Sequence, residues 1–106
     1  MKIYNKLVRD KIPEICKAHG DEPTIRIIDD VDEYAKALCA KLREEAQEVE
    51  ETPNLEELAD TLEVLYAIGK TLGHTPADIE GARAKKAKER GGFEKRIFLI
   101  RTEPQH

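Results

Sequence analysis

The chain has 106 residues and a net charge of −4, and 40% of its residues are hydrophobic against 38% charged. This length suits one domain with a modest core, so we expect residues 1–106 to form a single domain. The composition excludes collagen-like, disordered, disulfide-rich and membrane-spanning classes, and the acidic balance argues against a general nucleic-acid binder. No apolar stretch follows Met1 as in a secretory signal, so a cytoplasmic location is expected.

Helix and turn signals predict a mainly α fold, an antiparallel bundle of about four helices with a minor β element. Each expected helix begins at a capping residue or a proline and stops at a glycine or a proline. Asp10 is expected to cap the first of them. Two short β-branched runs predict the β element, Thr24–Ile28 and Ile97–Ile100. The expected helices run from Lys11 to Gly20, from Asp30 to the residue before Pro53, from Asn54 to near Gly73, and from Thr75 to Gly91.

Charge divides the chain into an acidic centre between two basic ends. From Asp29 to Asp60, twelve acidic residues oppose three basic ones, whereas from Arg83 to Arg96 seven basic residues oppose two acidic ones. Ordinary solvated helix faces account for most such charges. A polyphosphate site with its cations is the alternative, because it needs carboxylates for the metal and Lys or Arg for the phosphates.

The second expected helix places a carboxylate on its apolar face. Apolar residues recur there in steps of three, four or seven, and Glu45 lies on this seam between Leu42 and Val49. Glu48 follows three residues later, at the edge of the same face. A carboxylate facing a core is costly unless a charge or a hydrogen-bond donor meets it. Glu45 is therefore expected to have a partner.

The third expected helix is apolar on two sides. One stripe contains Leu55, Leu58, Leu62 and Leu65, and the roughly opposite one contains Glu57, Asp60, Val64 and Ile68. A helix of this kind must be covered on both faces, which is more than one small hairpin provides. We therefore expect a homo-oligomer, a dimer or tetramer, that completes the bundle.

A short turn at residues 52–54 predicts that these two helices pack antiparallel. Residues at equal distances from the turn then lie level with each other. Glu45 is level with Asp60, and Glu48 is level with Glu57. Four acids in one layer repel unless cations neutralise them. Oxygen ligands suit Mg²⁺ or Mn²⁺, and none of the expected helices contains the Glu-x-x-His pair of a di-iron bundle.

The acidic motif of the two helices reads Glu44-Glu45-Ala46-Gln47-Glu48, then Glu57-Leu58-Ala59-Asp60. It resembles the EExxE…ExxD signature of the MazG-like all-α nucleoside triphosphate pyrophosphohydrolases. The flanks, Asn5–Pro13 and Lys86–Arg96, resemble the segments that open and close the phosphoribosyl-ATP pyrophosphohydrolase-like branch. The resemblance extends from Lys6 to about Leu99. One departure is that only eight residues separate Glu48 from Glu57, fewer than is usual in the family.

The resemblance implies a Mg²⁺-dependent, oligomeric helical enzyme that cuts a nucleoside triphosphate between the α and β phosphates, giving a monophosphate and pyrophosphate. It implies that the metal ligands are Glu45, Glu48, Glu57 and Asp60, with Glu44 as the catalytic neighbour that orients or deprotonates water. The basic residues are then expected to bind the phosphates, namely Lys6, Arg9, Lys86 and Arg90.

Three functions stay open at this level. The first is the hydrolysis of non-standard or surplus nucleoside triphosphates, and the second is phosphoribosyl-ATP pyrophosphohydrolase activity in histidine biosynthesis. The third is a non-catalytic helical oligomerisation module whose acids form only ion pairs. No segment of the sequence indicates which base or sugar is bound.

Overall fold

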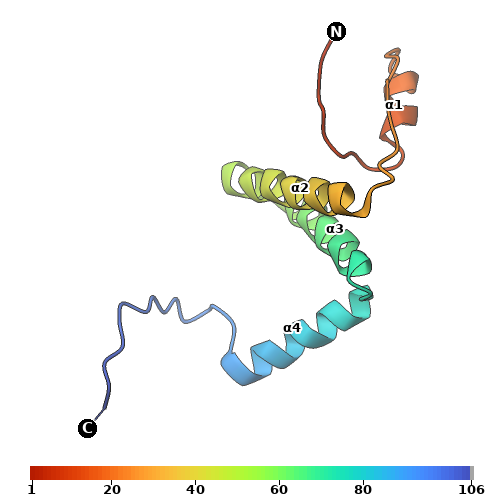
Figure 1. The fold of residues 1–106 in the computed structure, drawn as a ribbon. Helices are drawn as coiled ribbons and strands as arrows, with labels where there is room; N and C mark the ends of the chain where they lie inside the picture. Colours follow the sequence, from red (N-terminus) through yellow and green to blue (C-terminus); the bar gives the residue numbers. More distant parts are fainter. Residues whose placement is uncertain (106) are drawn as a thin grey trace.

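The protein is mainly α, as the sequence predicts. The computed structural model describes residues 1–105 and contains four helices in that range. They are α1 (Ile12–Ala18), α2 (Val31–Glu51), α3 (Leu55–Thr71) and α4 (Pro76–Arg90). Figure 1 shows α2 and α3 side by side at the centre, with α1 beyond the start of α2 and α4 beyond the end of α3. Within residues 1–105, no helix combines the length and the apolar character that crossing a bilayer requires.

Side-chain caps fix where the long helices begin. The Asp30 carboxylate accepts a hydrogen bond of 2.8 Å from the amide of Glu33 at the start of α2. The Asn54 side-chain oxygen accepts one of 2.8 Å from the amide of Glu57 at the start of α3. A reciprocal capping box opens α4. These bonds satisfy amides that a helix cannot pair itself. Helix α1 begins without a side-chain cap, so the cap predicted at Asp10 is wrong.

The helices α2 and α3 form an antiparallel hairpin that contains the small core. Leu38 on α2 is 3% exposed and Val64 on α3 is 8% exposed, and these are the buried apolar side chains of residues 1–105. The third buried side chain is a carboxylate, that of Glu45, which is 6% exposed. The acidic and apolar stripe of α3 therefore faces α2, as the level pairing across the turn predicts.

Helix α4 packs only against α3 among the helices of residues 1–105. The buried Gly69 lies at this contact, because a Cβ built there would come within 2.7 Å of Cδ1 of Ile79. The absence of a side chain lets α4 approach the last turns of α3. From this point α4 runs away from the hairpin, as Figure 1 shows.

The predicted β element is wrong for the described chain, because residues 1–105 contain no strand. The segments Thr24–Ile28 and Ile97–Ile100 are non-helical, and Figure 1 places them at opposite ends of the molecule. Their β-branched residues favour an extended backbone, but a strand also needs a neighbour for its amides and carbonyls. Neither segment has one among residues 1–105, and their isoleucines at 25, 27, 97 and 100 are exposed.

The arrangement is open and leaves apolar surface uncovered. The radius of gyration is 18.7 Å, whereas a compact chain of this length has about 13 Å. The leucine stripe of α3 stays uncovered, and its four leucines are all exposed: Leu55, Leu58, Leu62 and Leu65. One chain thus covers only one of the two apolar faces of α3.

Candidate metal centre

Three carboxylates from two helices meet beside the hairpin turn. Glu45 comes from α2, and Glu57 and Asp60 come from the first two turns of α3. One carboxylate oxygen of each residue lies within 4.8 Å of those of the other two. The antiparallel packing brings them together, since the short turn sets Glu45 level with Asp60 and the helical repeat sets Glu57 on the same face. We call these three residues the acidic trio.

Two oxygens of the acidic trio are buried without a donor. They are Oε2 of Glu45 and Oε2 of Glu57, and neither has a hydrogen-bond partner. Buried polar atoms in proteins are normally paired, because an unpaired one loses its hydration without compensation. A bound cation would supply a partner to both of these unpaired carboxyl oxygens.

Burial and charge both disfavour ionisation of Glu45. Its pKa is raised above the ordinary value, mainly because burial removes water from the carboxylate, and further because of the negative charge of Glu48. Asp60 adds to this effect. The ammonium of Lys41, 3.4 Å from Oε1 of Glu45, opposes it without cancelling it. These surroundings therefore favour the neutral form of the Glu45 carboxyl.

The fourth predicted ligand, Glu48, lies outside the acidic trio but next to it. The pKa of this half-buried carboxyl is raised, first because the neighbouring carboxyl of Glu57 favours its neutral form. Burial and the charges of Glu57 and Glu44 act in the same direction. The level pairing of Glu48 with Glu57 thus leaves Glu48 beside the acidic trio.

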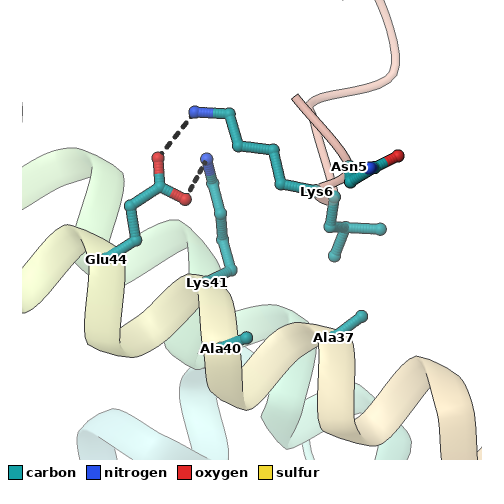
Figure 2. Close-up of a pocket in the computed structure, with 7 residues that line it drawn as sticks. Asn5, Lys6, Ala37, Ala40, Lys41 and Glu44 are labelled. Carbon is teal, nitrogen blue, oxygen red and sulfur yellow. Dashed lines mark hydrogen bonds and ion pairs between the residues drawn. The ribbon is translucent and has the colours of Figure 1, made fainter. Parts of the chain in front are cut away.

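Glu44 faces two lysines instead of the acidic trio. Its Oε1 accepts a 2.7 Å hydrogen bond from Nζ of Lys6, and its Oε2 lies 3.4 Å from Nζ of Lys41, as Figure 2 shows. The hydrogen bond from Lys6 is the main reason that the pKa of Glu44 is lowered, and Lys41 adds to it. Glu44 is therefore a firmly ionised anchor for two ammonium groups and a weak general base.

Lys41 is a site residue that the sequence analysis did not single out. Its side chain is 17% exposed and contacts both Glu44 and Glu45. The spacing of Lys41 could have indicated these contacts, because it precedes Glu44 by three residues and Glu45 by four, and helical side chains at these spacings meet.

The predicted phosphate-binding residues divide into two groups. Nη2 of Arg9 lies 2.8 Å from Oδ1 of Asp60, and Lys6 binds Glu44, so the N-terminal pair stands at the acidic centre. Lys86 and Arg90 are exposed on α4, which contacts neither α1 nor α2 within residues 1–105. One chain does not bring these two residues to the acidic trio.

The donor set fits a hard divalent ion. The acidic trio offers carboxylate oxygens from three residues, and neither His nor Cys belongs to it. Mg²⁺ and Mn²⁺ prefer oxygen ligands, and Mg²⁺ commonly takes a few carboxylates and leaves its other positions to water and substrate phosphates. Glu45, Glu57 and Asp60 could hold such an ion, with Glu48 as a further ligand.

Glu45→Gln is expected to raise the melting temperature of the metal-free protein at pH 7.5. A raised folded-state pKa means that the stability linked to protonation is complete below the ordinary value of 4.5 and is lost as the pH rises through the folded-state pKa. At about 4–8 °C per kcal/mol, the melting temperature of the variant should exceed that of wild type by several degrees. This difference should shrink as the pH falls towards 4, because Glu45 of the wild type is then protonated and so neutral as well.

Circular dichroism melts in EDTA between pH 4 and pH 8 measure this difference. Glu50→Gln, an exposed acid on the same helix, is the matched control and should change little. A lower melting temperature for Glu45→Gln at pH 7.5, or a difference independent of pH, contradicts the electrostatic description of Glu45.

Comparison with protein-family models gives no match, and no solved structure matches the chain. A stretch of 44 residues is 54% identical to an uncharacterized protein of Mycolicibacterium smegmatis, which corresponds to 42% of this chain and 44% of that protein. The matched stretch thus spans less than half the length of this curated relative.

Proposed function

We propose that the chain is a divalent-metal-dependent nucleoside triphosphate pyrophosphohydrolase that cuts between the α and β phosphates. The observation that carries this proposal is the acidic trio, with two buried oxygens that have no donor and with Lys6 and Arg9 beside it. Carboxylates for a metal next to cations for phosphate are the pair of features that polyphosphate chemistry needs. The EExxE…ExxD motif supports the same assignment.

The residues of the chain then have distinct tasks. Glu45, Glu57 and Asp60 would hold the ion, with Glu48 completing the set. When bound, Mg²⁺ would neutralise phosphate oxygens and lower the pKa of a water molecule. Lys6 and Arg9 would orient the triphosphate at the edge of the hairpin. Glu44 would position Lys6 and Lys41. Its lowered pKa makes it a weak base, which favours this role over the deprotonation of water.

We also propose that a second copy of the chain covers the open face of the hairpin. A hollow of about 420 Å³ lies on that face, lined by Ala46, Val49, Leu58, Thr61, Leu62 and Leu65. The basic Lys86 and Arg90 are left without a role in one chain, and the acidic centre of a second copy offers the complementary charge. A cytoplasmic location belongs to the same proposal, and the free thiols Cys16 and Cys39 suit a reducing compartment.

Leu62→Glu should convert the oligomer into a monomer, because it places a charge in the middle of this apolar face. Analytical ultracentrifugation measures the mass, and Ile27→Glu, an exposed isoleucine outside α3, is the control. The second-copy proposal is contradicted if the wild-type chain stays monomeric at a concentration about 100 times that used in the nucleotide-hydrolysis assay.

The enzymatic proposal is tested with a panel of nucleoside triphosphates, including modified bases and phosphoribosyl-ATP, in the presence of Mg²⁺ or Mn²⁺. The expected products are monophosphate and pyrophosphate in equal amounts, and EDTA should abolish the reaction. If no nucleotide is turned over and neither ion changes the melting temperature, the acids serve only the fold and an oligomerisation module is the better description.

A further inference from the structure

The segment Asn5–Arg9 lies across the acidic hairpin and is held there by two ion pairs. Lys6 binds Glu44, Arg9 binds Asp60, and Leu7 between them lines a hollow of about 120 Å³ against Ala37 and Ala40 of α2. Figure 2 shows Asn5 and Lys6 above α2, with Lys6 reaching to Glu44. We call residues 5–9 the N-terminal strap. Its two cations thus contact acids on both helices of the hairpin.

The two ion pairs of the strap differ in whether their acid belongs to the acidic trio. Glu44 is outside the acidic trio, so the bond from Lys6 leaves the candidate metal ligands free. Asp60 belongs to the acidic trio, and the guanidinium of Arg9 already lies 2.8 Å from its Oδ1. A cation at that oxygen competes with any metal ion for the same charge.

The contact between Arg9 and Asp60 is also the one that a metal ion can break. Both side chains are open to water, with 56% of Arg9 and 39% of Asp60 exposed, and ion pairs of this kind are weak. The ion pair between Lys6 and Glu44 does not involve the acidic trio, so it would hold the strap when Arg9 leaves Asp60. The freed guanidinium then stays close to the ion, and its planar fork suits phosphate oxygens.

We propose that Arg9 leaves Asp60 when a divalent ion binds the acidic trio, and that its guanidinium then forms an ion pair with the triphosphate instead. This inference rests on the proposed function, because it takes the acidic trio as the metal site. Before metal binds, Arg9 neutralises part of the charge of the acidic trio. After metal binds, the same side chain becomes a phosphate ligand, so one residue weakens metal binding and strengthens triphosphate binding.

The test measures two affinities of Arg9→Gln that should move in opposite directions. Electron paramagnetic resonance titration with Mn²⁺ alone should show about two- to fivefold tighter binding than in wild type, because the competitor is gone. Calorimetry with inorganic triphosphate in the presence of Mn²⁺ should show about tenfold weaker binding, because a charged hydrogen-bond donor is lost.

Lys11→Gln removes the same charge two residues further along the chain, from an exposed side chain, and should leave both affinities within about twofold. If Arg9→Gln binds Mn²⁺ no tighter than wild type, or if Lys11→Gln reproduces its effect, the displacement is disproved. Absence of Mn²⁺ binding in wild type and in both variants instead disproves the metal site, and with it the proposed function.

Discussion

Glu57→Gln should lower pyrophosphate release by about a hundredfold or more, since even groups one step away from a metal cost 10–100-fold when they are replaced. The amide keeps the shape of the side chain but removes the charge from an oxygen that is buried without a donor. The helix cap is not affected, because Asn54 binds the backbone amide of residue 57 and not its carboxylate. The variant should also lose the Mg²⁺-dependent rise in melting temperature.

Glu56→Gln is the matched control for this result, because Glu56 is an exposed acid in the same first turn of α3. It should retain full turnover and the full response to Mg²⁺. Steady-state rates and thermal melts of the two variants, at one protein concentration, make the comparison. Wild-type activity in Glu57→Gln contradicts the assignment of the acidic trio.

Leu38→Ala should lower the free energy of unfolding by about 2–5 kcal/mol, the range for emptying a buried leucine site. Leu38 is the most buried apolar side chain of the described residues, at 3% exposed. Val64 is the other buried apolar side chain among them, so the core has little else to stabilise it when Leu38 is truncated. Urea unfolding followed by circular dichroism measures the change.

Val31→Ala is the comparison for Leu38→Ala, because Val31 lies on the same helix and is 76% exposed. This change should cost less than about 0.5 kcal/mol, as surface substitutions usually do. Equal effects of the two substitutions contradict a core centred between α2 and α3.

The helical part of the fold was predictable because its signals are local. Asp30 and Asn54 cap the helices that their sequence positions predict, and each does so through the amide three residues later. The short turn then left one packing for α2 and α3, which is why Glu45 and Asp60 were expected at one level. The position of Glu45 on an apolar seam also predicted that its carboxylate faces the core, where it is buried.

The β element was predicted wrongly, and some contacts were not predicted at all, because both depend on segments that are far apart in the chain. Thr24–Ile28 and Ile97–Ile100 have the residues of strands, but the pairing that makes a strand is absent from the described chain. The ion pair between Arg9 and Asp60 joins residues 51 positions apart, and no spacing rule predicts it. The position of Lys86 and Arg90 depends on the direction in which α4 leaves α3.

The chemistry at Glu44 shows a different limit. The motif places an acid next to Glu45, but whether that acid acts on water or holds cations depends on what lies against it. Lys6 arrives from the N-terminal strap and Lys41 from the preceding turn of α2, and together they keep the pKa of Glu44 low. The sequence motif therefore identified Glu44 as a residue of the site, but it did not indicate that Glu44 binds two lysines.

The most direct test of the metal centre is anomalous diffraction from crystals grown with MnCl₂. We predict a manganese peak between α2 and α3, with carboxylate oxygens of Glu45, Glu57 and Asp60 at coordination distance, about 2.0–2.6 Å. A map in which these three carboxylates bind no ion, while manganese occupies other sites on the same molecule, would contradict the account.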